Sequence, residues 1–139
     1  MGALATTATR FVEEILNTGD WSRANEVLAD DVVMHHPSSP EPIRGLDEVR
    51  GFLGQFRAGM PDLSLVVEDV AEGDDAVAVR WRARGTHGAD LFGIPPTGHE
   101  IAIRGISFFR FADGRIVEDW VEENTFDVLL QLGVVPPPA

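Results

Sequence analysis

The acid with the clearest potential for chemistry is Asp119, which stands where a strand pattern calls for an apolar residue. In the segment 115–123, alternate side chains share a face if the backbone is extended, so Asp119 lies between Val117 and Val121. A carboxyl among apolar side chains has a raised pKa and suits acid/base work, such as taking a proton next to a carbonyl. The alternative is a buried structural acid, hydrogen-bonded to Ser107, a histidine or a backbone amide.

Other polar side chains are candidates for the same pocket. Ser107 lies in the apolar row of the segment 100–111, where it either orients a substrate or fills tight space in the sheet. His35 and His36 are neighbours on an extended segment, so they point in opposite directions and cannot bind one metal ion together. The residues before them favour His36 inward, toward a substrate oxygen. His87 lies in a turn at a strand end, where it either lines the entrance or stays at the rim.

Aromatic and aliphatic side chains complete the predicted site. Trp21 and Trp81 offer flat apolar rings on which an aromatic or polyene ligand stacks, and filling of the core is the alternative role. We predict one catalytic residue, Asp119, and no metal ligand. The predicted substrate-binding residues are His36, Trp81, His87, Phe92, Ser107, Phe109 and Val121.

The composition restricts the class of protein and its partners. A chain of 139 residues with 44% hydrophobic side chains fits a single globular domain over residues 1–139. The absence of cysteine excludes thiolate nucleophiles and agrees with a cytoplasmic protein. A formal net charge of −12 repels phosphate and anionic lipid, so we expect neither nucleic acid nor membrane as a partner. No nucleotide-binding, hydrolase-elbow or zinc-protease motif occurs, and we expect a small-molecule ligand and no cofactor.

The spacing of apolar residues predicts the elements that must position these side chains. The helices are predicted at about 4–17, 21–28, 46–59 and 125–132, and the strands at about 63–72, 76–86, 100–111 and 115–124. This order gives an α+β fold with the helices first. Helices packed on one face of a curved antiparallel sheet enclose a cone-shaped pocket that suits a small ligand.

A second apolar surface is predicted on the other face of the sheet. Ile106, Phe108, Ile116 and Trp120 share that face with several arginines. An apolar patch of this kind is typical of a surface that another sheet covers. We therefore expect a homodimer packed back to back through these residues, with arginine–glutamate pairs around the patch.

Several segments resemble the SnoaL-like polyketide cyclases, a branch of the NTF2-like fold, over nearly the whole chain. The segments are FVEEILNTGDW near the start, IRGLDEVRGFL, GTHGADLFGIPPTG, and FADGRIVEDW continuing to the terminal LLQLG. The resemblance implies an α+β cone with a pocket. It also implies a cofactor-independent enzyme that closes a ring by intramolecular aldol condensation, with an aspartate as acid/base and a histidine near it.

The resemblance also identifies a departure from the family pattern. Alignment of the DGR turn and the LLQLG segment without gaps puts the family's catalytic aspartate at Val121 and its histidine at Ser107. Because neither catalytic residue is kept, we predict that proton transfer has moved to Asp119, about two residues of strand rise from Val121. The alternatives are a cofactor-free hydroxylase or monooxygenase of the same branch and a noncatalytic small-molecule-binding domain.

Overall fold

A six-stranded sheet, with helices on one face, forms the framework of the protein. The computed structural model describes residues 2–138. The strands follow the order β2-β1-β6-β5-β4-β3 across the sheet. They are β1 (Leu28–His35), β2 (Ile43–Arg44), β3 (Ser64–Glu72), β4 (Ala76–Thr86), β5 (Glu100–Ala112) and β6 (Arg115–Glu123). The helices are α1 (Ala3–Arg10), the π-helical η1 (Phe11–Leu16), the 3₁₀ turn η2 (Ala24–Glu26), α2 (Leu46–Gly59) and α3 (Thr125–Leu132).

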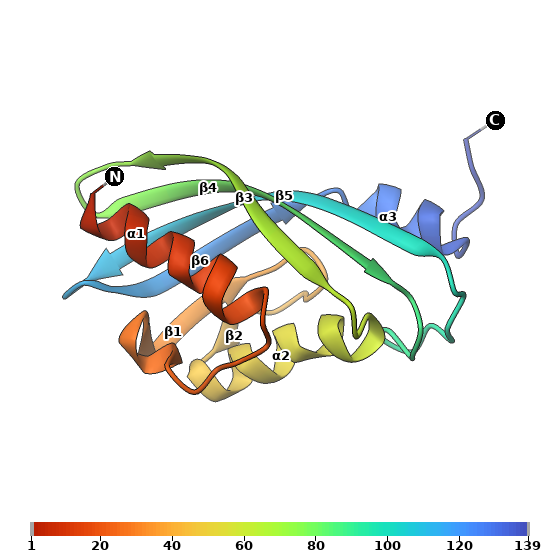
Figure 1. The fold of residues 1–139 in the computed structure, drawn as a ribbon, viewed down its shortest axis with the longest axis horizontal. Coiled ribbons are helices and arrows are strands. Elements are labelled where there is room, and N and C mark those ends of the chain that lie inside the picture. The colour runs from red at the N-terminus through yellow and green to blue at the C-terminus, as the bar shows by residue number, and fades with distance from the viewer. Residues whose placement is uncertain (1, 139) are drawn as a thin grey trace.

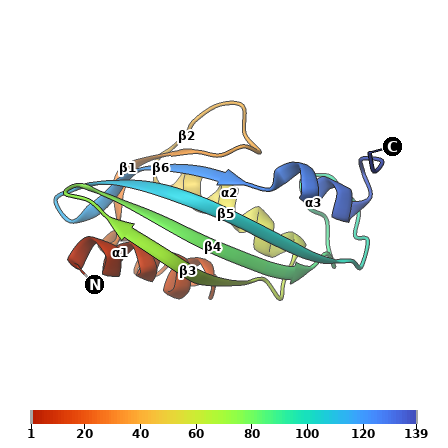
Figure 2. The same ribbon diagram turned by 90° about the horizontal axis from the view of Figure 1, so that it is seen from above.

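The sheet is curved, and its concave face covers the core. Figures 1 and 2 show β3 to β6 arching over α1 and α2, with α3 beyond the end of β6. Along β4 and β5, buried and exposed residues alternate, because successive side chains of a strand point to opposite faces. The predicted α+β class, with helices first and a curved sheet, is confirmed.

The sheet differs from the predicted all-antiparallel arrangement at β1. This strand pairs in parallel with β6, where Met34 lies opposite Asp119 and His35 opposite Trp120. The segment 21–28, which we predicted as a helix, forms only the short turn η2 before β1 begins at Leu28. The difference brings His36, which directly follows β1, beside the inward-facing Glu123 of β6, and it brings His35 beside Glu118 on the other face.

A register shift in β6 corrects the predicted faces of two residues: Val117 was predicted to face inward and Ile116 to belong to the outer apolar patch. Arg110 of β5 pairs with Glu118, and the next residue, Phe111, pairs with Ile116, so Val117 is an extra residue in its strand. A β-bulge of this kind reverses the alternation of faces on its far side. Ile116 is accordingly fully buried, whereas Val117 is only half-buried. Asp119 remains on the inner face, as predicted.

The predicted N-terminal helix is present with a change of winding. It begins as α1 and continues from Phe11 as η1, in which each turn is wider than in an α-helix. Phe11, Val12 and Leu16 of this wider segment face the cavity described below.

Candidate active site

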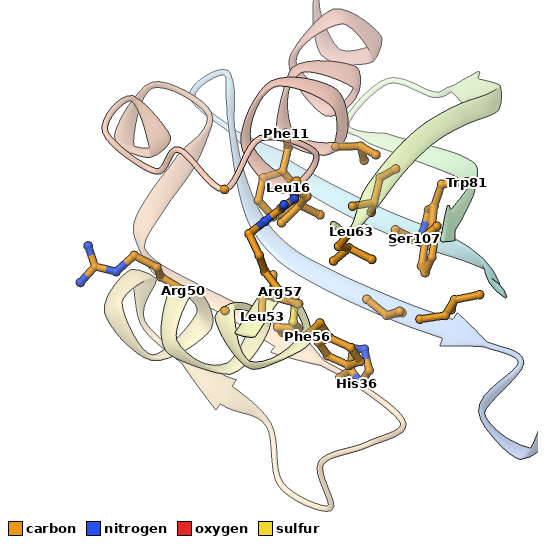
Figure 3. A pocket seen from close by; sticks show the side chains of 18 of the residues that line it. Phe11, Leu16, His36, Arg50, Leu53, Phe56, Arg57, Leu63, Trp81 and Ser107 are labelled. Carbon is orange, nitrogen blue, oxygen red and sulfur yellow. Dashed lines mark hydrogen bonds between the residues drawn. The ribbon is translucent and has the colours of Figure 1, made fainter. Parts of the chain in front are cut away.

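An apolar cavity of about 550 Å³ lies between the concave face of the sheet and the helices η1 and α2. Figure 3 shows Phe11 and Leu16 on one side, Leu53 and Phe56 of α2 on another, and Trp81 on the sheet. A volume of this order holds a small organic molecule and excludes a macromolecule.

Asp119 lies inside this cavity as an unpaired acid. Its residue is only 2% exposed, and it lines the cavity wall from β6. Its Oδ1 atom is buried without a hydrogen-bond partner among the described residues. Burial raises the pKa of the Asp119 carboxyl well above its usual range, because the charged form loses its hydration. Burial therefore favours the protonated form, which presents an O–H donor to the cavity.

A second acid, Glu123, reaches the same cavity and was missed by the sequence interpretation. Its side chain is 6% exposed, and its Oε1 lies 3.3 Å from Nε2 of His36, whose side chain is 3% exposed. Burial raises the pKa of Glu123 to about 7 and lowers the pKa of His36 to about 4. Extending the alternation of Asp119 and Val121 by one step would have placed Glu123 inward.

Neighbouring groups fix the orientation of His36. The backbone N–H of Ser38 donates a hydrogen bond to Nδ1 of His36 at 3.1 Å. The proton of the neutral imidazole therefore resides on Nε2, the atom that faces Glu123. Phe52 and Phe56 pack against the imidazole ring with centroid distances of 4.9 and 5.4 Å.

Trp81 and Ser107 form a hydrogen-bonded pair on the cavity wall. The Trp81 indole N–H donates to Ser107 Oγ at 2.9 Å, and Figure 3 shows the two side chains side by side. The indole lies over Gly105, where an added Cβ would be only 2.5 Å from Trp81 Cζ2 and 2.8 Å from the carbonyl oxygen of Glu122. Ser107 is also the direct cross-strand partner of Val121. The two positions at which the resemblance places the family's catalytic pair are thus in contact with the same cavity.

Two arginines of α2 line the cavity at its helical side. Arg57 Nη2 donates hydrogen bonds to the carbonyl oxygens of Leu16 at 2.6 Å and Asn17 at 2.9 Å. Figure 3 shows the Arg57 side chain reaching from α2 toward the end of η1. Arg50, in contrast, is 56% exposed and lies near Asp47. The guanidinium of Arg57 closes the polar end of η1, since the last carbonyls of a helix have no partner within the helix.

Comparison with known proteins assigns the chain to a family. The family model described as SnoaL-like polyketide cyclase matches residues 6–132. The chain belongs to the SnoaL-like polyketide cyclase family. No curated protein matched this SnoaL-like chain.

Solved structures give the same result for the fold. IdmH from Streptomyces antibioticus, a candidate polyketide cyclase, is 33% identical, with a TM-score of 0.80 over 94% of this chain and 98% of that chain. A candidate SnoaL-like polyketide cyclase from Jannaschia sp. CCS1 is 23% identical, with a TM-score of 0.87 over 96% and 94% of the two chains. AclR from Streptomyces galilaeus, a candidate hydroxylase, is 24% identical, with a TM-score of 0.82 over 98% and 84%. The SnoaL-like, NTF2-like cone is therefore confirmed.

The SnoaL-like cavity brings together five of the eight residues that we predicted for the site. The lining residues among them are His36, Trp81, Ser107, Asp119 and Val121. The inward orientation of His36 agrees with the prediction. His35 points to the other face, where its Nε2 lies 2.6 Å from Glu118 Oε2 and its ring stacks on Trp120.

Among the described residues that line the cavity, the other three predicted residues are not found. His87 is fully buried, with Nδ1 3.0 Å from Thr97 Oγ1 and Nε2 3.2 Å from the carbonyl oxygen of Ile94. His87 thus fastens the loop 87–99, which its sequence position in a turn did not reveal. Phe109 packs in the core against Phe11, with a centroid distance of 5.9 Å.

Phe92, the third of these residues, lies on the surface of that loop. It is 41% exposed and has a φ of 48°, which is uncommon for a residue other than glycine. Its ring packs against Phe56 at 5.0 Å and Phe52 at 5.7 Å, the two rings that hold His36. Phe92 therefore contacts the site through a second layer of aromatic rings.

Residues 2–138 contain neither a metal-binding cluster nor a membrane-spanning helix. No group of three or more histidine, aspartate or glutamate side chains there is arranged to hold a metal ion. No helix in this part of the chain is long and apolar enough to cross a membrane.

Proposed function

We propose that this protein is a cofactor-independent enzyme that transfers protons on a hydrophobic, oxygenated small molecule during an aldol-type ring closure. One observation carries the proposal: Asp119 is an unpaired, buried acid in the wall of an apolar cavity of about 550 Å³. Leaving a buried polar group unpaired costs about 1–3 kcal/mol of stability. Such a cost is typical of a site that serves a ligand.

The protonation state of Asp119 determines its role in this proposal. The sequence suggested a base that removes a proton next to a carbonyl. Because burial raises the pKa of Asp119 well above its usual range, the protonated carboxyl is favoured, and this form donates to an oxygen. In an aldol step, Asp119 hydrogen-bonds the carbonyl that is attacked and protonates the resulting alkoxide.

The lining of the cavity supports a polyketide-like substrate. Phe11, Leu53, Phe56 and Trp81 offer apolar surface for a carbon skeleton. The polar groups that face the same space are few, as expected where they read particular oxygen atoms of a ligand. The 33% identity with IdmH, described as a candidate polyketide cyclase, supports the same class of substrate.

A small diketone tests the proposal without the natural substrate. Ring closure of 2,7-octanedione, followed by loss of water, gives a conjugated enone that is followed by ultraviolet absorption. We expect the wild-type protein to accelerate this reaction over buffer, and Asp119→Asn to lower the rate about 100-fold. Quenching of tryptophan fluorescence by the diketone, which reports on Trp21 and Trp81 in the cavity wall, should be retained in the variant.

Glu118→Gln is the matched control for this experiment. It removes the neighbouring acid, which is on the outer face and near His35, so the rate should stay at the wild-type value. Equal rates for wild type and Asp119→Asn would remove Asp119 from the mechanism. Binding of the diketone without any turnover would favour a noncatalytic binding domain.

A cofactor-free hydroxylase is the second candidate, because AclR, described as a candidate hydroxylase, has the same fold. An oxygen electrode separates the two activities. Ring closure consumes no oxygen, whereas a hydroxylase or monooxygenase consumes one molecule of oxygen for each turnover. Oxygen uptake that depends on an added polyketide would support the second candidate.

A further inference from the structure

The pair formed by Glu123 and His36 is the part of the cavity that the proposed function leaves without a role. Both side chains are almost completely buried, both line the cavity, and their facing atoms are 3.3 Å apart. Two partly polar residues buried against a ligand space are costly to fold unless they serve the ligand.

We propose that Glu123, positioned by His36, is the base that removes a proton from the nucleophilic carbon of the substrate, while Asp119 acts on the oxygen of the carbonyl that is attacked. This inference rests on the proposed function and deepens it. It divides the reaction between two acids at opposite ends of the bond that forms.

The spacing of the two acids fits this division. Asp119 and Glu123 are four residues apart on β6, so their side chains share a face and their Cα atoms lie about 13 Å apart. An aldol step needs about 3 Å from each carboxyl to its target atom and about 3 Å between the reacting carbons. The two carboxyls can therefore lie up to about 10 Å apart, which suits side chains that project from these two positions. Simple enolisation of one ketone would need both groups within a shorter span.

The proposed step needs no reactant other than the substrate and the two carboxyl groups. Glu123 carboxylate takes the proton as the C–H bond breaks, and the electron pair forms the new C–C bond to the carbonyl carbon. The carbonyl π pair moves to the oxygen, which takes the proton of Asp119. Exchange of protons with water then returns Glu123 to the carboxylate and Asp119 to the acid.

The protonation states of the pair agree with these roles. Burial raises the pKa of Glu123 to about 7, so its carboxylate form is present near neutral pH while the base remains strong. Because His36 has a lowered pKa, its imidazole is neutral, and its Nε2 lies 3.3 Å from Oε1 of Glu123. His36 is thus a positioning residue that favours the ionised form of Glu123.

None of the other charged groups that line the cavity, among residues 2–138, forms an ion pair with Glu123. They are Asp119 on β6 and Arg50 and Arg57 on α2. Arg57 is bonded to the end of η1, and Arg50 lies near Asp47 at the surface. Within residues 2–138, the one cationic or imidazole nitrogen within ion-pair distance of Glu123 is that of His36.

The arrangement defines a class of substrate. The ligand carries an acidic C–H bond near Glu123 and a separate carbonyl near Asp119, joined by a chain flexible enough to bring the two carbons together. Trp81 lies in the same cross-strand row as Glu123, because both pair with Gly105, and its indole N–H reaches Ser107. The indole therefore offers a flat surface for the segment that joins the two reacting groups of the ligand.

A probe that needs a base but no acid tests the assignment. In 5-nitrobenzisoxazole, removal of the ring C–H proton breaks the N–O bond and releases a nitrophenolate that is stable without protonation. We expect the wild-type protein to exceed the rate of acetate at equal carboxylate concentration. Glu123→Gln should lower the rate about 100-fold or more, whereas Asp119→Asn should change it less than about threefold. In the diketone assay, both variants should lose activity.

Matched variants separate the chemistry from folding. Glu122→Gln alters the next residue on the outer face and should leave the rate unchanged. Glu123→Asp keeps an acid but withdraws it from the ligand, and we expect about a tenfold loss. The rate should rise with pH with a midpoint near 7, and His36→Phe should move that midpoint upward, because the carboxylate loses a donor.

Each failure has a distinct meaning. If Asp119→Asn greatly lowers the rate with 5-nitrobenzisoxazole and Glu123→Gln keeps the wild-type rate, Glu123 is not the base. The proposed function would still stand. A wild-type rate no higher than that of acetate would overturn the inference as well, and the diketone assay then decides the proposed function separately. An unchanged midpoint in His36→Phe would remove the positioning role of His36.

Discussion

The two faces of β6 carry the same types of residue in opposite environments. On the outer face, Glu118 lies 2.6 Å from a nitrogen of His35, and both side chains are about one-third exposed. On the inner face, Asp119 is buried, and its Oδ1 has no hydrogen-bond partner among the described residues. Glu123 lies 3.3 Å from His36 on the same face, and both of these side chains are buried. Each inner acid directly follows an outer one in the sequence, Asp119 after Glu118 and Glu123 after Glu122.

This comparison shows that the direction of the side chain, and not its type, decides what an acid does here. Water screens the outer pair, so its contribution to stability is small. Inside, loss of hydration shifts the pKa of Asp119 upward and raises the pKa of Glu123 to about 7. One strand therefore holds acids in water on one side and acids without hydration on the other.

The largest effect is expected from the apolar patch on the outer face of the sheet, where a second copy of the chain would bind. Ile106, Phe108 and Trp120 are 51%, 38% and 37% exposed, and we propose that a second copy of the chain covers them back to back. Trp120→Asp should weaken the dimer more than 100-fold, about 3 kcal/mol, as measured by light scattering across a concentration series. Val134→Asp, which alters an exposed residue after α3, is the control. A wild-type protein that is monomeric at all concentrations would refute the dimer.

The next effect concerns the wall of the cavity. Gly105→Ala should destabilise the protein by about 2–3 kcal/mol, because the added Cβ meets both the Trp81 ring and a backbone oxygen. Gly51→Ala, at an exposed position of α2 with open space around it, should instead stabilise by about 1 kcal/mol. Urea unfolding of the two variants measures the change in the free energy of unfolding, which should be a decrease for Gly105→Ala and an increase for Gly51→Ala. A stable Gly105→Ala would show that the Trp81 side of the cavity is free to move.

Replacing the unpaired acid by an apolar residue sharpens the contrast between the faces. Asp119→Leu should raise the free energy of unfolding by about 2 kcal/mol, since it removes an unsatisfied buried polar group and adds apolar contact. Glu118→Gln should change it by less than about 1 kcal/mol. Thermal unfolding of the pair tests the difference. Destabilisation by Asp119→Leu would mean that the acid holds the sheet together.

The smallest effect is a dependence of stability on pH. A carboxyl whose pKa is raised on folding holds a proton that the unfolded chain has lost, so its contribution to stability falls as the pH rises from about 4 toward the folded pKa. The stability of Asp119→Asn relative to wild type should therefore increase as the pH rises above about 4, by no more than about 1.4 kcal/mol for each pH unit. Urea unfolding at pH 5 and at pH 6 measures this increase. A constant difference would indicate an unshifted Asp119.

Local patterns predicted most of the framework and part of the site. Alternation along β4 and β5 is strong because one face is buried, and it placed Trp81 and Ser107 correctly in the wall. The same alternation placed Asp119 inward. It was wrong for Val117 because a bulge arises from pairing with another strand, which no local pattern reports.

The parts of the fold and of the site that the sequence did not predict depend on contacts between distant segments. The parallel pairing of β1 with β6 joins residues that are far apart in the chain, and it alone brings His36 to Glu123. His87 looked like a rim residue, because its turn position does not reveal the loop that it fastens from within. Periodicity identifies a face, but tertiary pairing decides which neighbours that face meets.

The parallel pairing of β1 with β6 also has a consequence for how the protein folds. The strands β3 to β6 follow one another as antiparallel neighbours, so they form from contacts that are local along the chain. β1 must instead close a loop of most of the chain before it lies beside β6, and such nonlocal contacts are slow to form. His36 and Glu123 meet only at that step. A chain trapped before it would have a nearly complete sheet and no assembled base, so the appearance of activity during refolding would time the arrival of β1.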